Sequence, residues 1–474
     1  MRRETKGSLN LLGFVLQING FLTLIPIIVA FIFNEIDALP PFLFMGFTFL
    51  ALGSFLIPIY KEFEIDFISA CFAIFLTYLS LSLIGSFPYL WYKDIIFPKL
   101  SLIDKLVNSL FESVSGYTTT GLTYINDYTQ LPRSLIFFRS LTQWLGGINI
   151  VFLTLMLFMS PRGEGIRSLA DILGFERITL SLKGLFKEVI KIYFTYTLIF
   201  FILLTFLGNI PLFESINITL AGISTGGFLP INRLDSLLNP FSYWIITATM
   251  MVGSLNFTLT SKIFGRRVGI VYLSEFYFWL IILGITSIIF LATSEAFPDK
   301  WFHLVSAATT GGFQYINIGE LKDSHKSILI FLMFMGGSAF STAGGIKILR
   351  IIIALGALKW FFEKLLLPER VITHLRIKER IIGEREVIQV FFLIIVGMLS
   401  LLIGTLIFTL YGYNLIDSLF ELTSAFATTG LSSGISFMEL PIPLRLILIF
   451  EMIFGRVEMI PLLIFFFLIF GLKK

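Results

Sequence analysis

The sequence predicts an all-α polytopic membrane protein, in which four pseudo-repeats surround one central pore and two extra spans precede them. Two observations predict this fold class. The 474 residues are 56% hydrophobic and only 14% charged, and a soluble chain has too little interior to bury that much apolar side chain. A Thr/Ser-Thr-Gly step also recurs four times, each time after a run of apolar or small residues. Internal repetition of this kind dictates architecture.

The two clearest copies are NSLFESVSGYTTTGLT at Asn108–Thr123 and DSLFELTSAFATTGLS at Asp417–Ser432, which align without gaps. Weaker copies lie at Lys300–Phe313 and Ile216–Phe228. A second glycine follows each step at a nearly constant distance, so that Gly146, Gly253, Gly336 and Gly455 follow the motif glycines Gly121, Gly226, Gly311 and Gly430. Four such coincidences indicate a true repeat rather than chance.

Crossing the hydrocarbon takes ~20 apolar residues. Ten segments meet this need: 9–33, 41–60, 67–90, 131–159, 191–209, 240–262, 272–293, 326–358, 387–411 and 443–471. The four steps lie between consecutive pairs of spans from the third onward and are too short to cross. Each repeat is therefore expected to run span, short re-entrant helix, extended turn, span. The expected divisions are a two-span extension at 1–66 and pore repeats at 67–160, 161–262, 263–358 and 359–474, the second and fourth of which begin with cytoplasmic linkers.

Lysine and arginine are concentrated in alternate loops, which by the positive-inside rule places the N-terminus in the cytoplasm. All four repeat steps then enter from the outer face. The basic segments 160–190 and 359–386 become cytoplasmic, and they suit either contact with anionic lipid or docking of a cytosolic subunit. The apolar run from Leu9 to Phe33 is too long for a signal-peptide core, so it is expected to remain as the first span.

The four steps are the candidate cation path. Irregular backbone at membrane depth is tolerated only where it is buried in protein or lines a water-filled cavity. Backbone carbonyls are natural ligands for a dehydrated monovalent cation, and glycine permits the φ values that such a turn needs. The residues expected to form this filter are Thr119, Thr120, Gly121, Ser224, Thr225, Gly226, Thr309, Thr310, Gly311, Thr428, Thr429 and Gly430. The alternative, small-residue helix contacts, would not recur between spans.

A second group of small residues interrupts the eighth span and must also line a cavity: Gly336, Gly337, Ser338, Ser341, Thr342, Gly344 and Gly345. Arg456 lies in the middle of the tenth span, where an arginine is a functional candidate by default. A structural pairing of Arg456 with Glu458 or Glu451 is the alternative. Glu112 and Glu421 are equivalent positions in two re-entrant helices, and they could brace the filter or bind the ion.

These features resemble the Trk/Ktr/HKT superfamily of potassium transporters, and in particular its TrkH branch, which has two extra N-terminal spans. The most specific matches are WLGGINI at Trp144–Ile150, GGSAFSTAGGIKILR at Gly336–Arg350 and GRVE at Gly455–Glu458. The resemblance covers residues 67–474. It implies filter glycines at Gly121, Gly226, Gly311 and Gly430, a gating loop at Gly336–Gly345 and a pore arginine at Arg456.

The resemblance also implies a function: the K⁺-conducting subunit of an uptake system in the inner membrane of a prokaryote. It implies a homodimer in the lipid bilayer, regulated by a cytosolic nucleotide-binding subunit resembling TrkA. A sodium-permeable relative, or one that couples K⁺ to Na⁺ or H⁺, is the alternative. Sodium-selective plant relatives carry serine where this chain has Gly121, which favours potassium.

Other functions find little support in the sequence. No nucleophile–base–orienter set indicates an enzyme, and neither a cofactor nor a nucleic-acid partner is expected; the potassium ion is the transported ligand. His303, His325 and His374 are scattered and lack zinc-ligand spacing. His303 is expected to be a wall residue of the third re-entrant helix.

Overall fold

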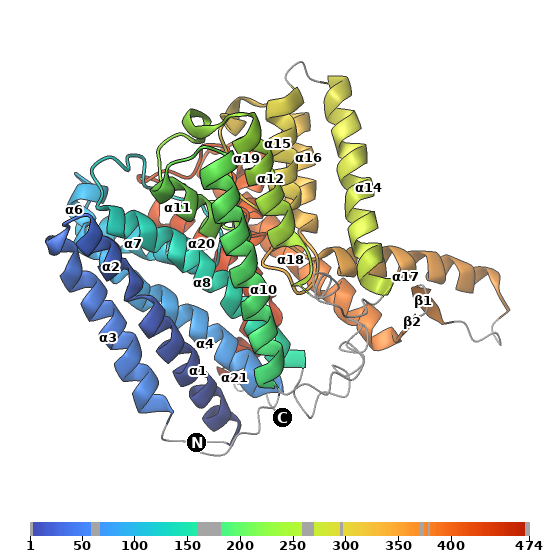
Figure 1. Cartoon of the computed structure of the whole chain (residues 1–474). Helices are drawn as coiled ribbons and strands as arrows, with labels where there is room; N and C mark the ends of the chain where they lie inside the picture. Colours follow the sequence, from blue (N-terminus) through green and yellow to red (C-terminus); the bar gives the residue numbers. More distant parts are fainter. Residues whose placement is uncertain are drawn as a thin grey trace.

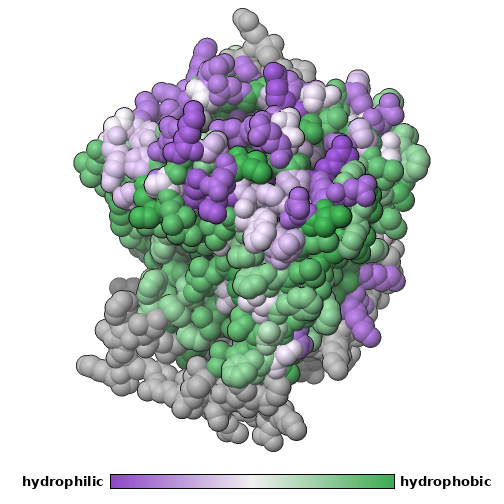
Figure 2. Space-filling view, turned by 90° about the vertical axis from the view of Figure 1, so that its left-hand side faces the viewer, coloured by the Kyte–Doolittle hydropathy of each residue, from purple (hydrophilic) through white to green (hydrophobic). Residues whose placement is uncertain are grey.

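The structure is a computed structural model, and it describes residues 3–57, 67–158, 182–257, 270–293, 297–368, 374–377 and 380–469. These residues form helices joined by extended segments, with one short hairpin (Figure 1). Seen from the side, a broad hydrophobic band lies beneath a hydrophilic cap (Figure 2). This distribution is typical of a protein surrounded by hydrocarbon, and it agrees with the predicted all-α polytopic membrane fold.

The N-terminal extension consists of α1 (Arg3–Leu22), α2 (Ile25–Ile32), η1 (Ile36–Ala38) and α3 (Leu39–Leu56). Pro26 lies in the first turn of α2, where its missing N–H costs no helical hydrogen bond. Gly13 of α1 and Gly53 of α3 face each other closely: a methyl group built at Gly53 would lie 2.8 Å from the Gly13 carbonyl oxygen. Glycines therefore let these two helices pack with their backbones in near contact.

The rest of the chain repeats one order of elements: a long helix, a shorter helix, an extended segment and a further helix. The first repeat comprises α4 (Phe67–Gly85), α5 (Phe87–Trp91), α6 (Lys93–Ile96), α7 (Leu102–Tyr117) and α8 (Arg133–Phe158). The second comprises α10 (Leu182–Ile202), η2 (Leu203–Leu207), α11 (Leu212–Ile223), η3 (Leu234–Leu237) and α12 (Pro240–Ser254).

The third repeat comprises α14 (Ile270–Thr293), α15 (Phe297–Ala308), η4 (Ile318–Glu320), α16 (Asp323–Met335) and α17 (Ile348–Leu366). The fourth comprises α18 (Glu384–Leu410), α19 (Leu415–Phe426), α20 (Ile442–Arg456) and α21 (Ile460–Ile469). The short helices have defined starts: Ser101 accepts a hydrogen bond from Asp104 N at the start of α7, and Asn414 caps α19 in the same way.

Within the described residues, six helical stretches are long and apolar enough to cross a membrane: 7–32, 36–56, 68–91, 133–153, 187–207 and 384–410. Two other predicted spans are broken. The eighth is divided into α16 and α17 by residues 336–347, as the glycines predicted. The tenth is divided into α20 and α21 just after Arg456, which the sequence did not predict; Glu458 and Met459 there have φ of 57° and 64°.

The two basic segments are not simple linkers along their whole length. Residues 160–181 of the first lie outside the described residues, and the remainder begins α10. The second, 359–386, is helical at both ends, because α17 continues to Leu366 and α18 begins at Glu384. Between them β1 (Leu375–Ile377) pairs antiparallel with β2 (Arg380–Ile382). This hairpin lies beside α17, which projects away from the helical bundle (Figure 1).

The first and last repeats are joined directly. Arg445 of α20 donates a hydrogen bond to Asn108 Oδ1 of α7 at 2.7 Å and forms an ion pair with Asp104. The Asn108 amide donates in turn to the Met438 carbonyl oxygen. These contacts join the fourth repeat to the first.

Candidate functional site

The four short helices end in the same backbone conformation. Two residues after the last residue of each helix, a threonine adopts a left-handed φ: 54° at Thr119, 50° at Thr225, 51° at Thr310 and 48° at Thr428. Positive φ is unfavourable for a β-branched residue and costs of order 1–3 kcal/mol. Its recurrence at four equivalent positions indicates that the surrounding structure imposes it, as happens at functional sites.

Two residues after each threonine comes a glycine with positive φ: Gly121 at 92°, Gly227 at 79°, Gly312 at 74° and Gly430 at 95°. The alignment by sequence paired Gly121 and Gly430 with Gly226 and Gly311 instead. In the second and third repeats the geometric equivalents therefore lie one residue further on. The reason is the doubled glycine in STGGF and TTGGF, which leaves the register open in sequence but not in backbone conformation.

These glycines pack against one another in a closed circle. A methyl group built at Gly121 would lie 2.1 Å from the Gly226 carbonyl oxygen, and one at Gly227 would lie 3.0 Å from that of Gly311. One at Gly312 would lie 2.0 Å from the Thr429 carbonyl oxygen, and one at Gly430 would lie 2.2 Å from that of Thr120. We call this arrangement of residues 119–121, 225–227, 310–312 and 428–430 the four-turn ring.

Carboxylates support the ring in two repeats. Glu112 Oε1 accepts hydrogen bonds from Tyr124 N at 2.6 Å and from the Thr123 hydroxyl at 2.7 Å. Glu421 Oε2 accepts from Ser433 N at 3.0 Å, twelve residues further on as in the first repeat. Both carboxylates are fully buried. Their oxygens are committed to the segment that follows the turn, and this geometry favours bracing over ion binding.

Two further braces were missed from the sequence. His303, expected to be a wall residue, is the geometric equivalent of Glu112 and accepts a hydrogen bond from Tyr315 N at 3.1 Å. The second repeat has Ile218 at that position and is braced from outside by Gln143 of α8, whose amide accepts from Phe228 N and donates to the Gly226 carbonyl oxygen at 2.6 Å. Alignment in the corrected register identifies His303, whereas Gln143 is visible only in three dimensions.

Arg139 of α8 was also missed. Its side chain is fully buried and pairs with Glu112 at 3.2 Å. It donates to the Thr123 hydroxyl at 2.9 Å, and its guanidinium lies 4.0 Å from the centre of the Phe228 ring. A buried charge requires such partners because desolvation is costly. Arg139 thus joins the supports of the first and second repeats.

The loops that follow these two turns are tied together by hydrogen bonds. Tyr128 N donates to Asn232 Oδ1 at 2.8 Å, and Asn232 Nδ2 donates to Asp127 at 3.1 Å. Hydrogen bonds from the Thr129 backbone N–H and hydroxyl, together with that of Asn232, hold the pKa of Asp127 below its ordinary value. The carboxylate therefore remains negatively charged at the exposed surface.

The inner loop, residues 336–347, packs against the ring. Gly336 and Gly345 have φ of 70° and 75°, which favours glycine at both positions. Thr342 N donates to the Gly253 carbonyl oxygen at 3.3 Å. A methyl group at Gly344 would lie 2.0 Å from the Ala427 carbonyl oxygen. The loop is therefore in close contact with the second and fourth repeats.

Arg456 holds this loop from α20. It is buried and donates to the Thr342 carbonyl oxygen at 2.7 Å and to the Gly146 carbonyl oxygen at 3.1 Å. The alternative pairings do not form: Glu458 pairs with Arg350 of α17, and Glu451 lies 3.4 Å from the Ser400 hydroxyl. The arginine therefore contacts the loop rather than a neighbouring carboxylate.

A carboxylate of α14 also supports the loop. Glu275 of α14 is fully buried and accepts a hydrogen bond from Ala339 N at 3.2 Å. Lys347, at the end of the loop, donates to the Ala343 carbonyl oxygen. A lone acidic residue in an otherwise apolar span was the sequence signal that could have identified Glu275.

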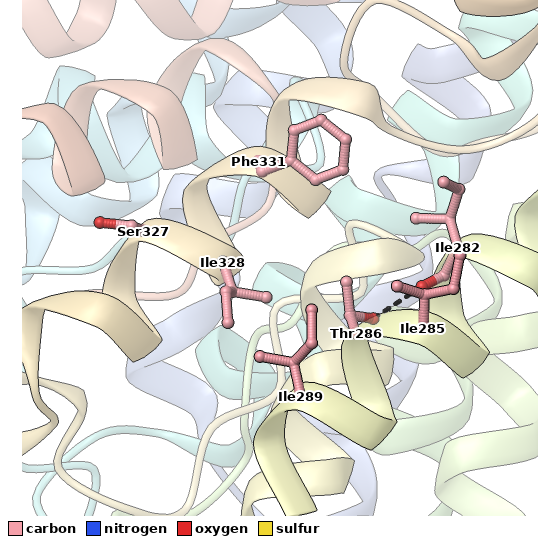
Figure 3. Close-up of a pocket in the computed structure, with 7 residues that line it drawn as sticks. All are labelled: Ile282, Ile285, Thr286, Ile289, Ser327, Ile328 and Phe331. Carbon is pink, nitrogen blue, oxygen red and sulfur yellow. Dashed lines mark hydrogen bonds between the residues drawn. The ribbon is translucent and has the colours of Figure 1, made fainter. Parts of the chain in front are cut away.

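A cleft of about 320 Å³ opens between α14 and α16 (Figure 3). Its lining is apolar and includes Ile282, Ile285 and Phe331. The hydroxyl of Thr286 donates to the Ile282 carbonyl oxygen of its own helix. The Ser327 hydroxyl, which also lines the cleft, donates to the Asp323 carbonyl oxygen of its own helix, so the cleft is not counted in the candidate cation path.

Comparison with known proteins gives a consistent result. The family described as TrkH, a cation transport protein, matches residues 79–279 and 268–471. An uncharacterized cation transporter of Methanocaldococcus jannaschii is 31% identical over 470 residues, covering 98% of this chain and 96% of that protein. The Trk system potassium uptake protein TrkH of Escherichia coli K12 is 27% identical over 472 residues, covering 94% of each chain.

The fold is also found in a solved structure. The crystal structure of the potassium transporter TrkH from Vibrio parahaemolyticus has a TM-score of 0.82 to this chain at 23% sequence identity. The match covers 97% of this chain and 98% of that one. The similarity therefore extends over the N-terminal extension and all four repeats.

Proposed function

Because this chain belongs to the TrkH family of cation transport proteins, we propose that it is the ion-conducting membrane subunit of a potassium uptake system. K⁺ enters from the outer face, loses its hydration shell in the four-turn ring and leaves past the inner loop. The observation that carries this proposal is the closed circle of four equivalent turns, each with a left-handed threonine and a positive-φ glycine. Rings of backbone carbonyls are the usual filters for potassium.

The assignment of potassium rests on similarity and on one residue. Relatives over most of the chain are named potassium uptake proteins. Gly121 closes the ring against the Gly226 carbonyl oxygen, leaving no space for a serine side chain. A sodium-permeable relative, or one that couples K⁺ to Na⁺ or H⁺, is the alternative that the flux experiment below distinguishes.

The inner loop is the proposed gate. Four glycines allow the loop two arrangements at low conformational cost, and the Arg456 guanidinium donates to its Thr342 carbonyl oxygen. The positive charge of Arg456 also opposes a cation beside it in a low-dielectric cavity. Together they keep the resting pore closed, and movement of α17 would draw the loop aside.

Regulation is proposed to come from a cytosolic nucleotide-binding ring resembling TrkA, docked on the basic segments 160–190 and 359–386. The protein would act as a homodimer with one pore per protomer, since two-fold dimers are the commonest oligomers. It would lie in the inner membrane of a prokaryote with its N-terminus in the cytoplasm. Its role is transport, with no enzymatic step and no cofactor.

The proposal is tested by flux of K⁺, Rb⁺, Na⁺ and Li⁺ into liposomes that contain the purified chain. We expect K⁺ and Rb⁺ to pass well ahead of Na⁺ and Li⁺. Gly121→Ser must displace the Gly226 carbonyl oxygen, and Gln143→Leu removes the amide that holds the same oxygen, so both variants should admit Na⁺. Unchanged selectivity in both folded variants would reject the ring as the filter.

A separate experiment tests the gate. Arg456→Ala should raise basal K⁺ flux in the absence of any partner while largely preserving the preference for K⁺, because the ring is untouched. Arg233→Ala is the matched control, since this arginine is exposed on an outer loop and pairs locally with Asp235. Resting flux that stays at the wild-type value in folded Arg456→Ala would show that the gate lies elsewhere.

A further inference from the structure

The N-terminal extension holds α8 at several points, of which the first is the start of the helix. Glu35 accepts hydrogen bonds from Arg133 N at 2.6 Å and from Ser134 N at 2.9 Å, one on each carboxylate oxygen. These donors belong to the first two residues of α8, and the first N–H groups of a helix have no partner within it. A carboxylate of the extension therefore caps α8, where the helix dipole favours negative charge.

Aromatic rings surround this cap. The Arg133 guanidinium lies 4.5 Å from the centre of the Phe33 ring and 5.4 Å from that of the Phe213 ring. The two rings meet edge to face, with their centres 5.5 Å apart. Phe213 belongs to α11, the short helix of the second repeat. The cap therefore also joins the extension to the second repeat.

Two more contacts lie further along α8. The rings of Phe42 in α3 and Phe138 in α8 have centres 5.5 Å apart, and both side chains are fully buried. The side-chain amides of Asn19 in α1 and Asn149 in α8 exchange hydrogen bonds of 3.1 and 3.4 Å in buried positions. Phe138 and Asn149 are separated by about three helical turns, so they lie on one face of α8.

A neighbouring face of α8 carries the residues that support the ring. Arg139 pairs with Glu112 at 3.2 Å. Gln143 donates to the Gly226 carbonyl oxygen at 2.6 Å. Positions four residues apart lie on one side of a helix, so a rotation or a shift of α8 would move both side chains together.

Building on the proposed potassium path, we infer that Glu35, Asn19 and Asn149 are positioning residues for ion selectivity. The cap fixes α8 along its axis, and the amide exchange fixes its rotation, so that Gln143 stays against the Gly226 carbonyl oxygen. Among the described residues, none of the three hydrogen-bonds to the ring itself. Their effect on selectivity therefore passes through α8, and the extension serves as a built-in support of the filter.

A purely structural role of the extension would lower stability and leave selectivity unchanged. We therefore measure the K⁺/Na⁺ flux ratio of the full-length chain in liposomes, at a temperature well below the unfolding of each variant. Glu35→Ala removes the cap and Asn149→Leu removes the amide exchange. Each should lower the ratio by at least about twofold, the lower end of the range for residues without contact to the ligand.

Two substitutions control for the loss of the cap. Glu35→Gln keeps one side-chain oxygen as an acceptor and should restore part of the ratio. Asp37→Ala removes the same charge from an exposed side chain of the extension and should leave the ratio unchanged. Amide hydrogen exchange of residues 133–136 should become faster in Glu35→Ala, because Arg133 N and Ser134 N lose their acceptor.

The route through Gln143 has its own test. In a chain that already carries Gln143→Leu, the contact with the Gly226 carbonyl oxygen is absent. Adding Glu35→Ala should then change the flux ratio much less than it does in the unsubstituted chain. Independent routes would instead give effects that add.

The inference is overturned if the ratio is unchanged in folded Glu35→Ala and Asn149→Leu chains, if Asp37→Ala lowers it as much, or if the effects of Glu35→Ala and Gln143→Leu add. Where Glu35→Ala does not fold, Glu35→Gln and Asn149→Leu carry the same test. These results leave the proposed function standing as long as the unsubstituted chain passes K⁺ ahead of Na⁺. Absence of that preference in the unsubstituted chain would instead reject the proposed function.

Discussion

The first and fourth repeats support the same backbone with different electrostatics. Glu112 and Glu421 are equivalent, fully buried and hydrogen-bonded to the backbone N–H twelve residues later. Glu112 also pairs with Arg139. The position equivalent to Arg139 in the fourth repeat is Leu448, and no ion pair of Glu421 is found among the described residues.

This difference shows that shape and charge are set by separate elements. In the first and fourth repeats the short helix supplies the brace that supports the turn. The long helix that follows the turn determines whether the carboxylate of the brace has a positively charged partner, which is Arg139 in the first repeat. Because Arg139 also contacts the Leu229 carbonyl oxygen and Phe228, the ion pair of the first repeat joins two repeats, whereas the Glu421 brace uses neutral donors such as Ser432 and Ser433 of its own repeat.

The largest expected effect is a difference in the free energy of unfolding between variants of the two carboxylates. Glu112→Ala leaves Arg139 buried without its partner and should lower the free energy of unfolding by about 3–5 kcal/mol. Glu421→Ala leaves hydrogen-bond donors unsatisfied but no charge, and should cost about 1–3 kcal/mol. Thermal unfolding in detergent measures both. Equal destabilisation would mean that the arginine does not distinguish the repeats.

A double-mutant cycle sharpens the same comparison. Glu112→Gln, Arg139→Met and the double variant should give a favourable coupling free energy within the range of about 0.5–3 kcal/mol found for contacting residues. Glu421→Gln combined with Leu448→Met is the matched cycle in the fourth repeat. It should be close to additive, and a coupling as large as that of the first repeat would contradict the account.

The last comparison concerns the neutral brace of the third repeat. His303→Leu leaves Tyr315 N without its acceptor and should cost about 1–3 kcal/mol, with a fall in the K⁺/Na⁺ flux ratio as this wall of the ring loosens. His303→Gln supplies a carbonyl oxygen and should restore part of the ratio. An unaltered ratio in a folded His303→Leu chain would limit this brace to stability.

The features of the fold and the site that could be predicted from the sequence were those with a local signal. The repeat order, the broken eighth span and Arg456 were visible because glycine clusters and a lone arginine contrast with apolar surroundings. The register in STGGF and TTGGF was missed because either glycine fits the pattern, and only backbone φ distinguishes Gly227 from Gly226. Arg139 was missed because its role depends on which helix lies beside it.

The break after Arg456 had local signals that the prediction of one continuous span did not use. Gly455 and Pro461 flank it in the sequence, and Pro461 lies in the first turn of α21, where proline favours the start of a helix. The left-handed conformation itself is carried by Glu458 and Met459, and tertiary contacts help to hold it. The pair between Glu458 and Arg350 of α17 is one such contact, and it joins residues 108 positions apart.

The contact between Arg445 and Asn108 has a consequence for biosynthesis. Its partners are separated by 337 residues, and a chain is made from its N-terminus at about 5–20 residues per second. The first re-entrant helix must therefore wait in the membrane for tens of seconds, with Asn108 and Asp104 lacking their final partner. During that interval the first and fourth repeats are not yet joined, and a chain that ends before Arg445 lacks the contact that joins them.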